Sequence, residues 1–198
     1  MGTLIIVDVQ NDFMEGGPLA TKGGSEIIPI INEIIQEFDH VVATQDWHPT
    51  NHGSFATNHE GKKPGDVIQL AGMDQILWPP HCVQETPGAE FVKGLNTNKF
   101  DKIFKKGMDP EIDSYSAFYD NGHKKSTGLT NYLREREVSA VWVCGVATEV
   151  CVKFTVLDAV SEGFETRLIS KACRGVEMNP GDIESAINEM KKAGAKIT

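Results

Sequence analysis

The segment around residues 140–152 constrains the fold of this chain most, because it joins a buried strand directly to a helix. Residues 140–144 form an apolar run, Gly145 follows, and a helical pattern begins near Thr148. Such a run is typical of a strand covered on both faces of a parallel sheet. Cys151 then falls in the first helical turn, where free N–H groups and the helix dipole favour a thiolate. Cys151 is therefore a candidate nucleophile, and a small buried core residue is the alternative that this segment leaves open.

The same alternation of strand and helix patterns recurs along the chain. Region 53–100 is the exception: it is irregular and rich in Gly, Pro, Asn and His, as functional loops often are. The alternation predicts an α/β three-layer sandwich, with helices on both faces of a mostly parallel central sheet of about six strands. We expect one domain over residues 1–198, with a long functional loop region at about 45–100. The predicted strands are 3–9, 40–44, 101–104, 140–144, 165–170 and 195–197, and the predicted helices are 25–38, 128–137, 148–163 and 180–193.

Composition and charge limit the class of partner. The chain has 198 residues and a formal net charge of −9, which argues against nucleic acid or an anionic membrane as the main partner. No apolar run approaches the roughly 20 residues of a transmembrane helix, and the N-terminus lacks the basic segment of a signal peptide. The cysteines form no CxxC pair, so reduced thiols in the cytoplasm are expected rather than a disulfide framework.

Polar, reactive side chains follow four predicted strands at the point where each strand ends. Asp8 ends the first strand, Asp46 and His48 follow the second, Lys106 follows the third, and Cys151 follows the fourth. Because sites in open α/β sheets form at the carboxyl ends of the strands, we expect these side chains to converge. A lysine close to Asp8 and Cys151 would hold both of them in their charged forms.

The pair Asp46-x-His48 places two potential metal ligands on the same side of an extended segment. His52 and His81 can each supply a further ligand from the loop region. One carboxylate with imidazoles suits zinc, iron or manganese. A solvated surface position is the alternative for each histidine, so the spacing alone leaves metal binding open.

A series of short motifs runs from residue 4 to about residue 178. Together, and in this order, they resemble the nicotinamidases of the isochorismatase-like cysteine hydrolases. The motifs are Val-Asp-Val-Gln-Asn-Asp-Phe at 7–13, Thr-Gln-Asp-Trp-His-Pro at 44–49, Asn-His-Gly-Ser-Phe at 51–55, Trp-Pro-Pro-His-Cys-Val-Gln at 78–84, Lys-Gly at 106–107, Asp-Ser-Tyr-Ser-Ala-Phe at 113–118 and Gly-Val-Ala-Thr-Glu-Val-Cys-Val at 145–152.

The resemblance implies the isochorismatase-like hydrolase fold and a full set of site residues. It implies an oxyanion hole made by the backbone N–H groups of Ala147 and Cys151, with a cis peptide bond between Val146 and Ala147. His52 and Ser54 lie where some relatives recruit an extra metal ligand, directly or through water. The remaining implied residues are the catalytic triad Asp8, Lys106 and Cys151, the metal ligands Asp46, His48 and His81, and the substrate-binding residues Phe13, Trp78, Tyr115, Val146 and Ala147.

The activity implied by the resemblance is hydrolysis of the carboxamide of nicotinamide to nicotinate and ammonia, through a thioester on Cys151, in NAD salvage. Pyrazinamide is a second expected substrate. One divalent metal ion is expected, Zn²⁺ ahead of Fe²⁺ or Mn²⁺. Two alternatives stay open: a related amidase that acts on a carbamoyl or ureido compound, and a non-catalytic metal-binding protein on the same fold. Members of the family occur as monomers and as homo-oligomers, so a homo-oligomer is also open.

Overall fold

The structure is a computed structural model that describes residues 2–198. Its centre is a six-stranded sheet in the order β5-β2-β1-β6-β7-β8. Each neighbouring pair in this sheet is parallel, which confirms the mostly parallel sheet predicted from the sequence. The strands are β1 (Gly2–Val7), β2 (His40–Asp46), β5 (Lys102–Lys106), β6 (Ala140–Val146), β7 (Glu165–Arg174) and β8 (Lys196–Ile197).

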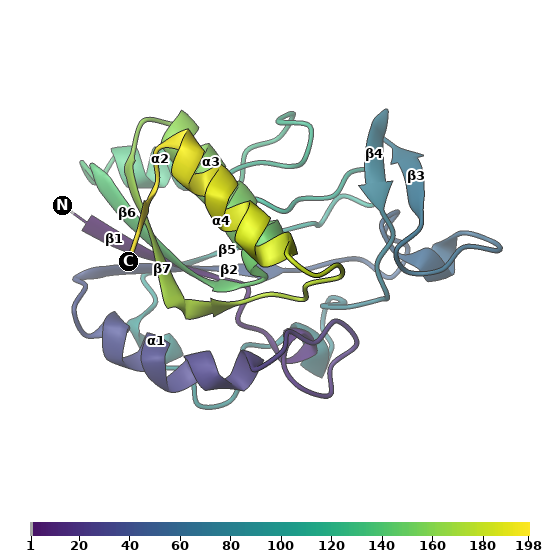
Figure 1. Ribbon diagram of the computed structural model, residues 1–198, viewed down its shortest axis with the longest axis horizontal. Coiled ribbons are helices and arrows are strands. Elements are labelled where there is room, and N and C mark those ends of the chain that lie inside the picture. Colours follow the sequence, from purple (N-terminus) through teal and green to yellow (C-terminus); the bar gives the residue numbers. More distant parts are fainter. Residues whose placement is uncertain (1) are drawn as a thin grey trace.

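Helices cover both faces of the sheet, as predicted. Helix α1 (Ile27–Ile35) lies on one face, and α3 (Lys153–Ser161) and α4 (Asp182–Ala193) lie on the other (Figure 1). The short helix α2 (Leu129–Arg134) belongs to the connection between β5 and β6. Helix α1 turns the buried side chains of Ile27, Ile31, Ile34 and Ile35 toward the core, so its isoleucine stripe is the apolar face expected from the spacing. No helix within residues 2–198 has the length and apolar character needed to cross a bilayer.

The central strands β1 and β6 approach each other closely at their carboxyl ends. Val7 on β1 is the register partner of Gly145 on β6. A Cβ atom at Gly145 would lie 2.1 Å from the carbonyl oxygen of Val7, and the φ angle of Gly145 is +120°. Only glycine tolerates both conditions. Gly145 thus lets the strand carrying the cysteine motif end directly beside Asp8.

Several strands run further than their apolar patterns indicated. Strands β2 and β6 extend two residues beyond the predicted ends, to Asp46 and Val146, and β5 extends to Lys106. Asp46 and Lys106 are register partners, so both are the last residues of adjacent parallel strands. The apolar pattern ended too early because residues 45–46 and 105–106 are polar and Gly145 interrupts the apolar run, whereas the backbone ladder continues through all of these positions.

The prediction that residues 53–100 are irregular is partly wrong, because this region contains a β-hairpin. Strands β3 (Val67–Leu70) and β4 (Met73–Ile76) pair antiparallel in a separate two-stranded sheet, which projects from one end of the molecule in Figure 1. The turn residues Ala71 and Gly72 both have positive φ angles, 52° and 82°. Turns of this kind suit two-residue hairpins, but Ala-Gly is a weaker signal than Asn-Gly or Asp-Gly.

The helix predicted from Thr148 begins with a wider turn than expected. Residues Thr148–Val152 form a π-helix, and the α-helix α3 starts only at Lys153. The N–H group of Val152 donates to the carbonyl oxygen of Ala147, five residues earlier, at 3.1 Å. Short π-helical turns occur frequently at functional sites, and this one carries Cys151.

Candidate active site

Lys106 lies at the centre of the site and is 2% exposed. Its Nζ atom lies 2.8 Å from Asp8 Oδ2 and 2.5 Å from Asp46 Oδ1. It also donates to Cys151 Sγ at 3.4 Å and to the carbonyl oxygen of Ser114 at 3.0 Å. The convergence predicted from the strand ends is therefore present: one ammonium group contacts a carboxylate, a thiol and the carboxylate of the proposed metal group.

Asp8 is fully buried and lies immediately beyond the end of β1. The Thr44 hydroxyl donates to Asp8 Oδ1 at 2.6 Å, and the backbone N–H of Asp8 donates to the same hydroxyl oxygen at 3.2 Å. Burial raises the pKa of Asp8 to about 6, against the opposing effect of the positive charge on Lys106. A carboxyl group with this pKa can exchange a proton near neutral pH, as a general base must.

Cys151 is 6% exposed, and its Sγ lies within 4.8 Å of carboxylate oxygens of Asp8 and Asp46. Burial raises the pKa of the Cys151 thiol well above its ordinary value, and the charge of Lys106 does not offset this rise. Asp8, with a pKa of about 6, is mostly charged at neutral pH, as expected. For Cys151 the direction is opposite to the expectation that the helix terminus and Lys106 favour the thiolate. Desolvation outweighs both effects, so Cys151 needs a base to remove its proton.

The side chains of Asp46, His48 and His81 form a buried group that could hold a metal ion. Asp46 Oδ2 lies 3.6 Å from His48 Nε2 and 3.8 Å from His81 Nε2. The Nδ1 atom of each imidazole lies 2.8 Å from a backbone carbonyl oxygen, that of Gly107 for His48 and that of Pro79 for His81. Both Nε2 atoms are thus directed at the carboxylate, the arrangement in which histidines usually bind metal ions.

The charge states of Asp46 and His81 also suit a cation. Burial lowers the pKa of His48, but the contact with Asp46 outweighs it and raises that pKa, so His48 must lose a proton to bind an ion. Burial raises the pKa of Asp46, but the charge of Lys106 and the contacts with His48 outweigh it and hold the pKa well below the ordinary value. Burial, together with the charge of His48, lowers the pKa of His81 to about 4. At neutral pH the group therefore offers a carboxylate and a neutral His81 imidazole, and a metal ion fits this donor set.

His52 and Ser54 lie beside this group. The ring centroids of His48 and His52 are 4.4 Å apart, and His52 Nδ1 lies 2.7 Å from Ser54 Oγ. The Nε2 atom of His52 is buried and has no hydrogen-bond partner within the described residues. Burial lowers the pKa of His52 to about 4, so its ring is neutral at physiological pH.

A narrow cavity opens onto Cys151 and onto the metal group of Asp46, His48 and His81. Its walls include the expected substrate-binding residues Phe13, Trp78, Tyr115 and Ala147, together with Cys151. Val146 is buried, and it is not among the residues that line the cavity. The peptide bond between Val146 and Ala147 is cis, as the resemblance implied.

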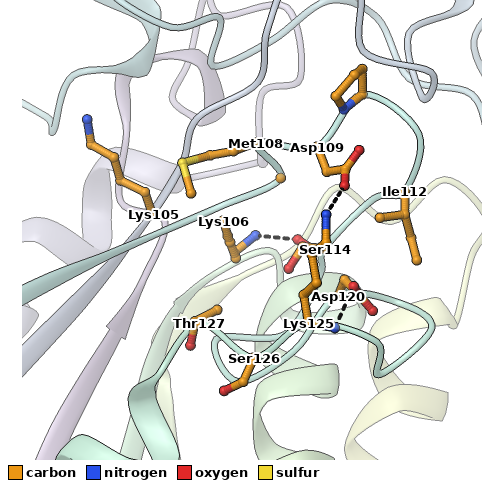
Figure 2. A pocket seen from close by; sticks show the side chains of 12 residues that line it. Lys105, Lys106, Met108, Asp109, Ile112, Ser114, Asp120, Lys125, Ser126 and Thr127 are labelled. Atoms are coloured by element: carbon orange, nitrogen blue, oxygen red, sulfur yellow. Dashed lines mark hydrogen bonds and ion pairs between the residues drawn. The ribbon is translucent and has the colours of Figure 1, made fainter.

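A larger cavity, of about 510 Å³, also borders Lys106 (Figure 2). It lies between the segment 105–112 and the loop 120–127, where Lys125 pairs with Asp109. The carboxylate of Asp120 accepts hydrogen bonds from backbone N–H groups of the same loop. Lys106 is the only residue of the triad or of the metal group among those lining this cavity, so the reactive groups are assembled at the narrow cavity instead.

Several residues that support the site were not predicted. Thr44 binds Asp8, and the Gln10 side chain bonds both the N–H and the carbonyl oxygen of Asp46 at 2.8 Å. Asp12 Oδ2 accepts a 2.7 Å hydrogen bond from the N–H of Cys82, which fixes the segment that carries His81. Gln10, Asp12 and Thr44 lie inside the motifs at 7–13 and 44–49, so their position in those motifs was the available signal.

The fold agrees with comparisons with known proteins. Residues 3–198 match the family model described as the isochorismatase domain. The chain is 47% identical over 193 residues to the nicotinamidase of Acinetobacter baylyi, covering 98% of this chain and 90% of that protein. It is 44% identical over 198 residues to the nicotinamidase of Escherichia coli, covering 98% and 92%.

Solved structures of nicotinamidases and pyrazinamidases are also similar to this chain. A nicotinamidase and pyrazinamidase of Acinetobacter baumanii superposes with a TM-score of 0.96 at 48% identity, covering 99% of this chain and 94% of that chain. The yeast nicotinamidase Pnc1p bound to the inhibitor nicotinaldehyde gives 0.94 at 33% identity, covering 100% and 99%. The pyrazinamidase of Pyrococcus horikoshii in complex with zinc gives 0.81 at 42% identity, covering 100% and 98%.

These comparisons place the chain in a class and then in a family. The parallel sheet covered by helices defines an α/β protein, and the matching nicotinamidases define its class as amide hydrolase. This chain belongs to the isochorismatase domain family, and the curated relatives that match it over nearly its full length are nicotinamidases.

Proposed function

We propose that this chain is a nicotinamidase: it hydrolyses nicotinamide to nicotinate and ammonia, a step of NAD salvage, and it also accepts pyrazinamide. The observation that carries the proposal is the junction at Lys106. Its ammonium group contacts Asp8, Cys151 and Asp46 together, so a nucleophile and a metal group face one aromatic-walled cavity. The near-full-length identity to nicotinamidases supports the same substrate.

In this proposal Asp8, Lys106 and Cys151 form the catalytic triad. Asp8 removes the thiol proton of Cys151, and the sulfur attacks the carboxamide carbon. The carbonyl oxygen then becomes an oxyanion, held by the backbone N–H groups of Ala147 and Cys151. Asp8 returns the proton to the amide nitrogen, the C–N bond breaks, and ammonia leaves a thioester on Cys151.

The second half of the reaction uses the same base. Asp8 takes a proton from a water molecule, which attacks the thioester carbon. The C–S bond breaks, nicotinate is released, and Cys151 regains its proton. Burial lowers the pKa of Lys106, but the neighbouring Asp46 and Asp8 carboxylates raise it further, to well above its ordinary value. Lys106 thus stays charged throughout and holds Asp8 in place.

Asp46, His48 and His81 would hold one divalent metal ion, and we favour Zn²⁺ over Fe²⁺ or Mn²⁺. The zinc complex of the Pyrococcus horikoshii relative supports this choice, as does a donor set of one carboxylate and two imidazoles. When bound, the ion would supply Lewis-acid chemistry at the end of the cavity where Asp46, His48 and His81 lie. His52 and Ser54 would add a further ligand, directly or through a water molecule.

The substrate is a small aromatic amide held between aromatic side chains. Phe13 and Trp78 take the two faces of the pyridine ring, and Tyr115, Val146 and Ala147 complete the surroundings. The nicotinaldehyde complex of the yeast relative supports a pyridine ring in such a cavity. All of these residues belong to one domain that we assign to residues 1–198, with the metal and substrate loops at about 45–100.

An ammonia-release assay tests the function. Purified protein loaded with Zn²⁺ should release ammonia from nicotinamide and from pyrazinamide, with a matching amount of nicotinate or pyrazinoate. Turnover of carbamoyl or ureido compounds, with no ammonia from nicotinamide, would instead support the related amidase. Metal binding without turnover of any amide would support the non-catalytic alternative.

A further inference from the structure

The β3–β4 hairpin contacts the residues of the substrate cavity through one buried side chain. Among the residues of its two strands, only Gln75 is buried, with 4% exposure. An isolated two-stranded hairpin is marginally stable in water, so it needs contacts with the rest of the protein. A buried polar amide such as that of Gln75 requires hydrogen-bond partners, and those partners show which part of the protein the hairpin contacts.

All of these partners belong to the cavity or to the strand itself. Gln75 Nε2 donates to the hydroxyl oxygen of Tyr115 at 2.8 Å, to Asp113 Oδ2 at 3.2 Å and to the carbonyl oxygen of Ile76 at 2.7 Å. The carboxylate and the carbonyl can only accept hydrogen bonds, so they fix which end of the amide is the nitrogen.

The chain of hydrogen bonds continues to the indole that faces the substrate. Trp78 Nε1 donates to the same Tyr115 hydroxyl at 3.1 Å, and the two rings meet edge to face with centroids 6.4 Å apart. Trp78 and Tyr115 both line the cavity, whereas Gln75 is not among the lining residues. Burial raises the pKa of Tyr115, so its hydroxyl stays neutral and can accept both bonds.

We propose that Gln75 is a positioning residue for substrate binding: through the Tyr115 hydroxyl it sets the orientation of the Trp78 ring against the pyridine ring. Gln75 itself touches neither the substrate nor the triad. Its loss leaves Cys151, Asp8 and Lys106 in place and loosens only the aromatic wall. The inference rests on the proposed nicotinamidase function, because it concerns how that substrate is held.

The test compares variants of the zinc-loaded protein. Gln75→Met keeps the length of the side chain and removes its hydrogen bonds, and Tyr115→Phe removes the hydroxyl that links Gln75 to Trp78. Each variant should raise KM for nicotinamide by about threefold to tenfold, the effect of one lost hydrogen bond, and change kcat by less than about twofold. Gln69→Met, on the exposed side of the same hairpin, is the matched control and should keep the wild-type KM.

A double variant separates positioning from simple support of the hairpin. Because both residues act through one hydroxyl, Gln75→Met combined with Tyr115→Phe should raise KM no more than the larger single effect. The inference would be overturned if the increase in KM of the double variant were the product of the two single increases, or if Tyr115→Phe kept the wild-type KM. Where Gln75→Met does not fold, Gln75→Leu takes its place in the same comparison.

A binding measurement keeps this inference distinct from the proposed function. Calorimetry with nicotinamide on the Cys151→Ala background should show the same loss of affinity for Gln75→Met and Tyr115→Phe. If nicotinamide binds, and binds more weakly in the Gln75 variant, but the wild type does not turn it over, the proposed function is contradicted and the inference about Gln75 stands. Absence of both binding and turnover in the wild type would contradict both.

Discussion

At the scale of single residues, Asp8 shows how burial prepares a base. Desolvation raises the pKa of its carboxyl group to about 6, while Lys106 and the Thr44 hydroxyl each lower it. The sequence identified Asp8 and Lys106 from their positions at strand ends. It did not predict the direction of the pKa shift, because that depends on how completely water is excluded from a site assembled by distant segments.

The pH dependence of activity follows from this pKa. The base form of Asp8 is lost as pH falls through about 6, so kcat/KM for nicotinamide should fall by about tenfold for each pH unit below that value. Thr44→Val removes a hydrogen bond that stabilises the carboxylate and should move the fall to higher pH. The measurement is ammonia release between pH 4.5 and 8, with metal content determined at each pH. If the fall in kcat/KM stays at the same pH or moves to lower pH in Thr44→Val, the role of Asp8 as the base is contradicted.

The nucleophile can be tested by removing one sulfur atom. Cys151→Ala should lower ammonia release by at least about 10³-fold, because no other group can form the thioester. Its thermal transition and metal content should stay close to those of the wild type. Cys173→Ala is the control, since this buried cysteine is hydrogen-bonded to the carbonyl oxygen of Ile169 outside the site and should keep the activity. Retained turnover in Cys151→Ala would refute the mechanism.

At the scale of secondary-structure elements, strands were easier to predict than the segments that leave them. The apolar runs of β1 and β6 were clear because parallel strands are buried on both faces. The π-helical turn at Thr148–Val152 has the same residue types as an α-helical start, so only the backbone of the folded chain distinguishes the two. The β3–β4 hairpin was missed because its strands bury no apolar side chain, and Gln75 is their one buried residue.

The junction of β1 and β6 gives a prediction about stability. Gly145→Ala would place a methyl group 2.1 Å from the Val7 carbonyl oxygen, so the two central strands must separate. We expect a loss of at least about 3 kcal/mol in the free energy of unfolding, measured by urea denaturation. Gly163→Ala is the matched control: its φ angle is +86° but a Cβ meets open space, so it should cost only about 1 kcal/mol. Equal losses in the two variants would contradict the close approach.

At the scale of the whole molecule, the order of the strands assembles the site. Because β5, β2, β1 and β6 are adjacent and parallel, the carboxyl ends that carry Lys106, Asp46 and Asp8 meet beside the turn that carries Cys151. His81 arrives from a long connection and depends on the hydrogen bond between Asp12 and Cys82 for its position. A metal ion held by Asp46, His48 and His81 would therefore join segments that are distant in the sequence.

Removal of the metal should destabilise the molecule as well as inactivate it. An ion present at 100 times its Kd stabilises the folded state by about 2.7 kcal/mol, so chelation should lower Tm by roughly 5–10 °C for a chain of this size. Added Zn²⁺ should restore both Tm and ammonia release. His81→Ala should lose the response of Tm to chelation, whereas His40→Ala, whose ring lies near Asp101, should keep it. An unchanged Tm on chelation of the metal-loaded wild type would contradict this metal group.

The sequence by itself determined the sheet class, the central strands and the chemical identity of the candidate residues. Those features depend on local apolar patterns and on residues inside short motifs, such as Asp8 after β1 and Cys151 after β6. The tertiary structure decided the charge states, the supporting contacts of Thr44 and Gln10, and the link from Gln75 to Trp78. These depend on burial and on contacts between segments that are far apart in the chain, and local residue patterns do not encode such distances.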